Sequence, residues 1–315
     1  MKKKTKIFVK AIVITFSIFA LLLIVGYVYI YVLPKGPAVT QAKPIATGTD
    51  SFVMYAHKNS QRKSIKVWTY KPKTWQNSDK ILFVMHGGGR NADDYLNAWK
   101  AIAEKQKLLI IAPEFASKFA KFATNDYQEG NLFTFFGTRN SPEKWAYAVI
   151  ENIFDRIKKD NQFTHATYDI FGHSAGGQFV HRMVMLMPQA RISTAIAANA
   201  GFYTFPDETL KFPYGLKNTP VKLKTGLTQA FQKNLIILLG AKDNNPNLGI
   251  FRKTDLAMKQ GGHRLARGSN FYQAARQLQA KNQLKFRWKI DTVANVGHNY
   301  RKMSQSAVRW LKTTP

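Results

Sequence analysis

Residues 172–176 read Gly-His-Ser-Ala-Gly, a Gly-x-Ser-x-Gly pentapeptide that stands between a predicted strand, 167–171, and a predicted helix, 177–187. In a strand-to-helix turn of this composition, the serine occupies a sharp, strained position that exposes its hydroxyl group. The glycines keep side chains out of the space where strand and helix approach each other. The pentapeptide therefore predicts that Ser174 is a nucleophile, provided that the chain also supplies a base, an acid and an oxyanion site.

Apolar runs of strand length alternate with amphipathic stretches of helix length on both sides of this pentapeptide. The expected strands are 64–70, 81–85, 108–112, 167–171, 192–198, 235–239 and 285–293, and the expected helices are 94–104, 142–159, 177–187, 270–282 and 299–312. Such alternation predicts an α/β fold with a mostly parallel sheet and helices on both faces. The first strand alternates polar and apolar residues, which is typical of an antiparallel edge strand. Residues 201–229 fit neither period and are expected to be irregular.

A glycine-rich segment, His-Gly-Gly-Gly-Arg at 86–90, directly follows the apolar strand 81–85. Three consecutive glycines let the main chain turn its amide hydrogens toward a ligand. The amides of Gly88 and Gly89, together with that of Ala175, are therefore candidates for an oxyanion hole. The segment lacks the Lys-Ser/Thr ending of a P-loop and the glycine spacing of a dinucleotide fingerprint, which disfavours phosphate binding.

A catalytic acid is expected after the serine and before the histidine, the chain order of a hydrolase with this serine turn. Asp243 follows the apolar strand 235–239 after a short turn, at the sheet edge where catalytic groups collect. The other carboxylates considered lie in polar stretches or inside a predicted strand: Asp207, Glu208, Asp255 and Asp291. We therefore predict that Asp243 is the acid.

Two histidines follow Asp243, and only one of them has the expected context. His298 lies in a short loop between the last predicted strand and the last predicted helix, so its ring can reach a hydroxyl at the sheet edge. His263 belongs to a Gly-Gly-His-Arg turn, 261–264, which we expect at the surface. We predict that His298 is the base, and that His173 and His181 are packing residues.

The N-terminus has the pattern of a membrane-targeting segment. Five of the first ten residues are lysines, and residues 11–32 carry no charge. This length suits a bilayer span of about 20 residues better than the apolar region of a cleavable signal peptide, about 7 to 15 residues. We expect a cytoplasmic segment at 1–10, a transmembrane anchor at 11–32, a linker at 33–50 and one catalytic domain at 51–315, exported to the periplasm or the outside of the cell. Cleavage near 40–42, followed by secretion, is the alternative.

The composition narrows the classes of partner and chemistry. The formal net charge is +29, and the chain without residues 1–42 still carries +23. Such a field favours an anionic lipid or glycan surface, whereas no nucleic-acid module is recognisable. The absence of cysteine excludes disulfides, thiolate catalysis and cysteine-ligated metals. Since no His-Glu-x-x-His zinc motif occurs either, we expect no metal and no cofactor.

Taken together, these segments resemble the α/β-hydrolase serine esterases, and more narrowly the polyhydroxybutyrate depolymerase and feruloyl esterase group. The resemblance covers about residue 64 to the C-terminus and is carried by 86–95, 172–178, 240–243 and 296–300. It implies a serine hydrolase that cleaves carboxylic esters through a Ser-His-Asp triad and an acyl-enzyme.

Two departures from that group bear on the substrate. Its secreted members commonly carry disulfides and attached binding modules, whereas this chain has no cysteine and no spare length for such a module. A soluble or membrane-proximal ester is therefore favoured over an insoluble polymer. Two alternatives stay open. One is a peptidase or acyltransferase with the same triad, and the other is a non-catalytic, membrane-tethered binding protein.

Overall fold

The computed structural model describes residues 2–118 and 122–311, which form an α/β domain preceded by a long helix. The described residues build an eight-stranded sheet in the order β1-β2-β4-β3-β5-β6-β7-β8. The strands are β1 (Gly48–His57), β2 (Ser60–Lys71), β3 (Ile81–Met85), β4 (Leu109–Glu114), β5 (Tyr168–His173), β6 (Ile192–Ala198), β7 (Asn234–Gly240) and β8 (Lys289–Val293). The strands from β4 to β8 in this order run parallel, so the predicted mostly parallel sheet is confirmed.

The antiparallel part of the sheet is larger than the sequence suggested. β2 is antiparallel to β4, as expected, but it is not the edge strand, because β1 pairs with its outer side. The first half of β1 is polar and reads like a linker, whereas its second half buries Phe52, Val53 and Met54. The strand is held by a hairpin with β2, a pairing that alternation within one segment does not reveal.

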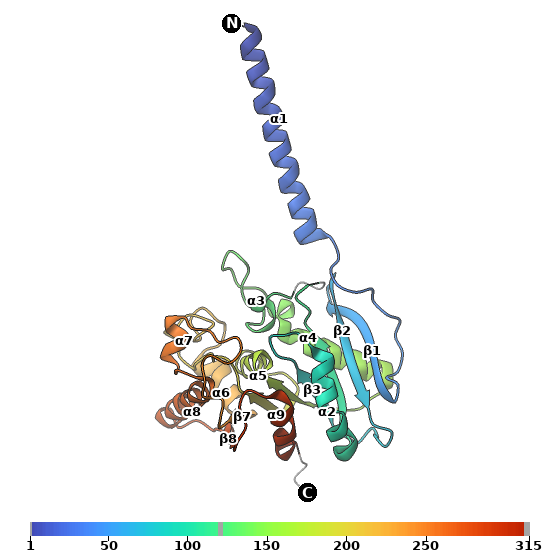
Figure 1. The fold of residues 1–315 in the computed structure, drawn as a ribbon, viewed down its shortest axis with the longest axis vertical. Coiled ribbons are helices and arrows are strands. Elements are labelled where there is room, and N and C mark those ends of the chain that lie inside the picture. Colours follow the sequence, from blue (N-terminus) through green and yellow to red (C-terminus); the bar gives the residue numbers. More distant parts are fainter. Residues whose placement is uncertain (1, 119–121, 312–315) are drawn as a thin grey trace.

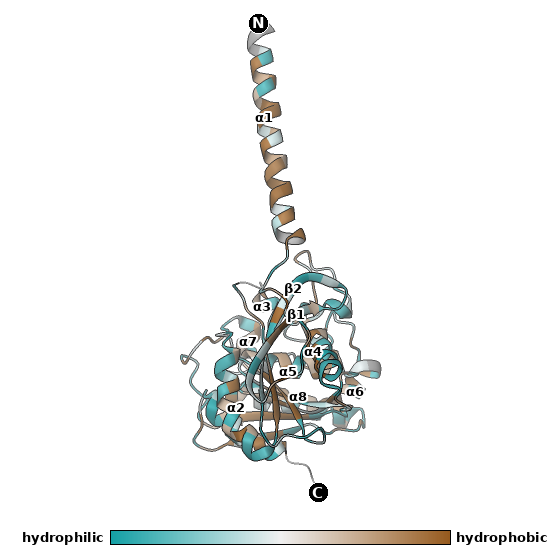
Figure 2. Ribbon diagram, turned by 90° about the vertical axis from the view of Figure 1, so that its right-hand side faces the viewer, coloured by the Kyte–Doolittle hydropathy of each residue, from teal (hydrophilic) through white to brown (hydrophobic). Residues whose placement is uncertain are grey.

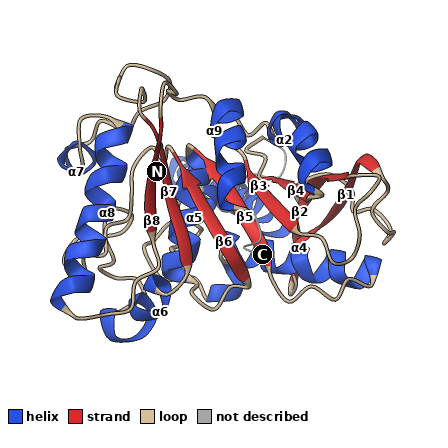
Figure 3. Cartoon of the chain, turned by 90° about the horizontal axis from the view of Figure 1, so that it is seen from below, coloured by secondary structure: helices blue, strands red, loops and turns tan. Residues whose placement is uncertain are grey.

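Helices cover both faces of the sheet, each over its own apolar core (Figure 3). The helices α2 (Ala92–Gln106) and α9 (Tyr300–Ala307) lie on one face, and α4 (Ala146–Asn161), α5 (Ala175–Leu186) and α8 (Arg264–Lys281) pack on the other. Short α-helices in the connections are α3 (Thr124–Tyr127), α6 (Thr228–Phe231) and α7 (Asp255–Lys259). Because β3 is buried on both faces, its sequence is continuously apolar.

The first helix, α1 (Lys2–Tyr27), projects away from the domain and continues into a π-helical turn, Val28–Val32 (Figure 1). Its stretch Thr5–Tyr27 is long and apolar enough to cross a membrane, and none of it is buried against the domain (Figure 2). These properties fit a membrane anchor or a signal helix.

The segment after α1 packs back onto the domain. The amide of Lys35 donates to the carbonyl of Arg62, and the carbonyl of Lys35 accepts from the amide of Ser64. Further along, Ile45 joins the apolar core and its amide donates to Asn161. Much of the expected linker, 33–50, is therefore bound to the folded domain.

Candidate active site

Ser174 stands at the turn from β5 into α5 in the strained conformation that its sequence context predicts. Its φ is 58° and its ψ is −113°, values that residues other than glycine rarely adopt. Its amide donates to the carbonyl of Ala198, and its carbonyl accepts from the amide of Gln178. The flanking glycines are needed for packing, since a Cβ on Gly176 would collide with the carbonyl oxygen of Met85.

The glycine-rich loop, residues 86–90, which is the candidate oxyanion loop, lies beside this serine. A Cβ built on Gly87 would stand 3.8 Å from the Cβ of Ser174. Within the described parts of the chain, the amides of Gly88, Gly89 and Ala175 donate to no backbone or side-chain acceptor. These three amides are therefore available as donors to a ligand, as the predicted oxyanion hole requires.

His86 supports the candidate oxyanion loop through hydrogen bonds to the backbone. Its buried ring accepts from the amide of Phe115 at Nε2, 3.1 Å away, so the proton is on Nδ1 and is donated to the carbonyl of Gly87 at 2.9 Å. Burial lowers the pKa of His86 to about 3, which keeps the ring neutral. The histidine at this position is a support for the loop and not a base.

Asp243 and His298 meet at the same edge of the sheet, after β7 and β8. Nδ1 of His298 lies 2.7 Å from Oδ2 of Asp243. The aspartate side chain is fully buried, whereas the histidine side chain is 19% exposed. Within residues 2–118 and 122–311, Oγ of Ser174 makes no hydrogen bond to His298, but the ring of His298 packs 4.5 Å from that of its neighbour His173. In enzymes without substrate, catalytic hydrogen bonds of this kind are often long or misaligned.

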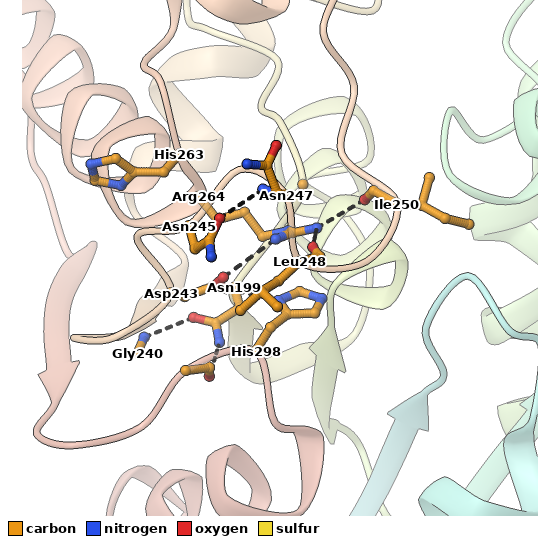
Figure 4. A network of polar contacts seen from close by, with 12 residues as sticks. Asn199, Gly240, Asp243, Asn245, Asn247, Leu248, Ile250, His263, Arg264 and His298 are labelled. Atoms are coloured by element: carbon orange, nitrogen blue, oxygen red, sulfur yellow. Dashed lines mark hydrogen bonds and ion pairs between the residues drawn. The ribbon is translucent and has the colours of Figure 1, made fainter.

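Sequence reasoning missed Arg264, which holds Asp243 from the side opposite His298 (Figure 4). The arginine is buried, and its Nη1 lies 3.3 Å from Oδ1 of the aspartate. Its Nη2 donates to the carbonyls of Leu248 and Ile250 at 3.0 and 2.9 Å, which ties the loop after β7 to the same cation.

The turn 261–264 was expected at the surface, and its arginine is instead in the interior. His263, by contrast, caps α8, since its ring accepts from the amide of Ala266. The sequence offers no signal that separates this arginine from the other basic residues of the chain, because its partners come from distant loops.

Asn199, at the end of β6, joins the two loops that carry the acid and the histidine (Figure 4). Its Oδ1 accepts from the amide of Gly240 at 2.7 Å, and its Nδ2 donates to the carbonyl of Gly297 at 3.0 Å. Its backbone adopts a φ of 45°, which asparagine tolerates better than most residues. It too was not predicted from sequence.

The remaining histidines near the serine are buried and neutral. Nδ1 of His173 lies 3.0 Å from the hydroxyl of Tyr95, whose ring stacks on that of Tyr300. His181 donates from Nδ1 to the carbonyl of Gly177 and accepts at Nε2 from the amide of Thr204. Burial holds the pKa of both rings well below the ordinary value. Both side chains pack as expected.

A cavity of about 450 Å³ lies between the segment after α1 and the end of β4. Among its lining residues are Gly36, Pro37, Trp68, Asp93 and Glu114, and neither the serine, the acid nor the histidine is one of them. In the described ranges, no group of three or more His, Asp or Glu side chains is arranged to hold a metal ion.

Comparisons with known proteins place this geometry in a family. No family model and no curated protein matches the chain. Among solved structures, poly(aspartic acid) hydrolase-1 from Sphingomonas sp. KT-1 is 41% identical, with a TM-score of 0.80 over 84% of this chain and 98% of that chain. LpqC, a poly(3-hydroxybutyrate) depolymerase from Bordetella parapertussis, is 29% identical, with a TM-score of 0.80 over 86% of this chain and 92% of that chain.

A more distant likeness supports the fold alone. An S-formylglutathione hydrolase from Agrobacterium tumefaciens is 12% identical, with a TM-score of 0.54 over 87% of this chain and 98% of that chain. The similarity to the poly(aspartic acid) hydrolase spans nearly all of that enzyme and most of this chain. The chain therefore belongs to the α/β-hydrolase family, in the esterase-like group of serine hydrolases that includes these two polymer-degrading enzymes.

Proposed function

We propose that the protein cleaves carboxylic esters, with Ser174 as nucleophile, His298 as general base and Asp243 as the acid that orients the histidine. The observation that carries the proposal is the 2.7 Å contact between Nδ1 of His298 and the buried carboxylate of Asp243. A carboxylate that accepts the Nδ1 proton leaves Nε2 as the basic nitrogen. This pair lies at the carboxyl-terminal edge of the sheet, where Ser174 stands at the end of β5.

The reaction divides into two steps that use the histidine twice. In the first step, Oγ of Ser174 attacks the acyl carbon, Nε2 of His298 takes the hydroxyl proton, and the leaving alcohol departs with that proton. In the second step, Nε2 of His298 takes a proton from the water that attacks the acyl-serine. It then returns that proton to Oγ of Ser174 as the carboxylic acid is released. Asp243 stays ionised throughout and stabilises the imidazolium.

Both steps place negative charge on the former carbonyl oxygen. The amide of Ala175, with that of Gly88 or Gly89, is free to donate to this oxyanion. Such donors stabilise the transition state because they are already oriented when charge develops, and losing one typically costs about 3 to 4 kcal/mol. The reaction calls for no metal or cofactor.

The proposal is tested with the full-length chain, solubilised in detergent. We expect a fluorophosphonate probe to label Ser174 and short nitrophenyl esters to be hydrolysed, and Ser174→Ala to abolish both. If the purified protein neither reacts with the probe nor releases nitrophenol, the proposal is wrong. A Ser174→Ala variant that leaves every cellular phenotype intact would instead support a non-catalytic binding protein.

A second candidate substrate is an amide-linked anionic polymer. It is favoured by the 41% identity to a poly(aspartic acid) hydrolase and by the net charge of +23 outside residues 1–42. A basic surface attracts a polyanion, and this attraction weakens as salt screens it. Incubation with poly(aspartic acid) separates the candidates: shortening of the polymer that slows with added salt supports amide cleavage, and an unchanged polymer supports the ester alone. Product partitioning with added alcohols tests for acyl transfer.

For location, we propose that residues 1–10 lie in the cytoplasm, 11–32 span the membrane, and the domain of 51–315 is exported. The proposal is supported by the lysine-rich start of α1 and by its exposed apolar length. Fractionation of cells tests it. We expect the full-length chain in the membrane fraction, with the domain degraded by protease added from outside the cytoplasmic membrane, whereas a shorter, released form would indicate signal cleavage.

A further inference from the structure

Two phenylalanines stand at the tip of a short hairpin, residues 132–140, which we call the aromatic hairpin. The exposed fractions of Phe135 and Phe136 are 94% and 84%. Their rings meet at nearly a right angle, with centroids 5.4 Å apart. Adjacent large aromatic side chains with this exposure mark a surface that contacts a partner.

The aromatic hairpin is ordered by its own hydrogen bonds. The amide of Thr134 donates to the carbonyl of Thr138 at 2.8 Å, and the amide of Gly137 donates to the carbonyl of Thr134 at 3.0 Å. Gly137 has a φ of 79°, which the turn requires. At the base, Leu132 is buried in the core. The hairpin therefore holds its two phenylalanines outward and away from the core.

The aromatic hairpin reaches toward the side of the domain from which α1 leaves. In Figure 1 the loop that follows α3, drawn in green, rises to about the level at which α1 ends. A bilayer crossed by α1 would meet the domain at this level. If these phenylalanines were on the opposite side of the domain, where α2 ends, they could not reach that bilayer.

The tether between α1 and the domain is very short. The π-helical turn ends at Val32, and Lys35 is already hydrogen-bonded to β2. Only Leu33 and Pro34 lie between them, and two extended residues span about 7 Å. The domain is therefore held against any membrane that α1 crosses.

The charge around the tip suits a lipid surface. Between Glu129 and Glu143, residues 130–142 contain an exposed Arg139 and no acidic residue. Aromatic rings with an adjacent cation are the side chains that favour the boundary between headgroups and acyl chains. A second apolar tip, Ile250, is also exposed, but it belongs to the loop held by Arg264.

We propose that the aromatic hairpin inserts Phe135 and Phe136 into the headgroup boundary of the bilayer that α1 crosses. The proposal rests on the membrane anchoring proposed above. A single helix leaves the domain free to rotate about the helix axis, whereas a second contact fixes which side of the domain faces the lipid. The hairpin thus orients the active-site loops relative to the membrane.

The natural absence of cysteine makes the test specific, because one introduced cysteine is the only site for a thiol-reactive dye. Three full-length variants are labelled with an environment-sensitive fluorophore: Phe135→Cys at the tip, Lys105→Cys on the last turn of α2, and Ile18→Cys in the middle of α1. Each is reconstituted into vesicles of phosphatidylcholine with a fraction of phosphatidylglycerol. Emission is recorded with and without lipids brominated on their acyl chains, and with aqueous iodide.

We expect the dye at 135 to emit at shorter wavelength in vesicles than in detergent-free buffer, to be quenched by brominated lipid and to be shielded from iodide. The dye at 105 should stay water-exposed, and the dye at 18 should report the bilayer interior. If the dye at 18 lies in lipid while the dye at 135 behaves like the dye at 105, the hairpin proposal is wrong and the membrane anchoring is supported. If the dye at 18 is also exposed to water, the proposed membrane anchoring is wrong. A blue shift at 135 that appears without vesicles and grows with protein concentration would overturn the proposal in favour of a contact between copies.

Discussion

The two sides of the active site are built by different means. On the serine side, residues 86–90 and 172–178, the backbone approaches so closely that only glycine fits at Gly172 and Gly176. On the acid–histidine side, the loops that carry Asp243 and His298 are held by polar side chains from other parts of the chain, Arg264 and Asn199. One side depends on the absence of side chains, and the other depends on their hydrogen bonds.

The two sides should therefore respond differently to substitution. A close backbone contact cannot adapt to an added Cβ, so a small change on the serine side should disturb the fold itself. A polar support can be removed while the loop it holds keeps most of its packing, so changes on the acid–histidine side should weaken catalysis beyond their effect on the fold. Four predictions test this comparison.

The largest effect should come from the proposed catalytic groups, and it should be larger for the serine than for the aspartate. Ser174→Ala should lower kcat/KM for a nitrophenyl ester by about a millionfold, whereas Asp243→Asn should lower it by about ten-thousandfold, because the histidine keeps its place but loses its orienting charge. Initial rates of both variants check this. Circular dichroism should show unchanged folding for Ser174→Ala, and an activity within tenfold of the parent would contradict its role.

The second prediction separates support of the acid from support of the fold. Arg264→Met leaves the buried carboxylate of Asp243 with His298 as its remaining partner, and breaking a buried ion pair costs about 3 to 5 kcal/mol of stability. Misplacement of the acid and histidine should also lower kcat by about a hundredfold with little change in KM. Urea denaturation and steady-state kinetics measure the two effects.

Arg267→Met is the matched control. Arg267 is equally buried on α8, but it donates to the carbonyls of Gly201, Arg252 and Gly261 and not to the acid. Its loss should cost stability while kcat of the folded fraction stays near that of the parent. Equal losses of kcat in the two variants would show that Arg264 acts only through the fold.

The serine side was predictable from the sequence because its requirements are local. The glycines, the strand before them and the helix after them stand within one stretch, and the expected turn geometry occurs at Ser174. The strands 81–85 and 192–198 were also predicted to the residue. For 81–85 the reason is that a parallel strand buried on both faces is continuously apolar.

The supports of the acid–histidine side were not predictable, because their partners are far apart in the chain. Arg264 bonds to an aspartate 21 residues earlier, and Asn199 bonds to a carbonyl 98 residues later. A basic residue after two glycines is ordinarily solvated, and nothing in its neighbours indicates burial. The strand β1 was missed for a related reason, since its polar first half is recognisable only through its pairing with β2.

The third prediction tests the rigidity of the serine side. In Gly176→Ala, the new Cβ would overlap the backbone carbonyl of Met85, which no rotamer change relieves. We expect a loss of stability of about 3 kcal/mol or more from this overpacking. Gly88→Ala is the control within the same site, because a Cβ there meets no atom within 4 Å. Equal denaturation midpoints for the two variants would contradict the claim that close backbone approach builds this side.

The smallest effect per residue is a pH dependence of stability that comes from three buried neutral histidines near the serine side. Burial holds the pKa of His86, His173 and His181 far below the value of about 6.5 in the unfolded chain. Between the two values the unfolded state binds more protons, so stability is complete above about pH 6.5 and is lost as the pH falls. Each histidine should contribute about 1.4 kcal/mol per pH unit in that window.

Urea denaturation of the full chain at pH 7, 6 and 5 measures this slope, and His181→Gln isolates one contribution to it. The glutamine amide can still accept from Thr204, so the variant should fold, while it has no group that titrates. Its slope between pH 6 and 5 should be smaller than that of the parent by about one histidine. Burial acts to raise the pKa of Asp207, but its hydrogen bonds with Thr209 lower that pKa overall. Carboxylates with a lowered pKa titrate mainly below about pH 4, so they do not interfere with this measurement. An unchanged slope in the variant would mean that the ring of His181 takes up a proton in the folded state. That outcome would contradict the structure, in which Nδ1 already donates to Gly177 and Nε2 accepts from Thr204.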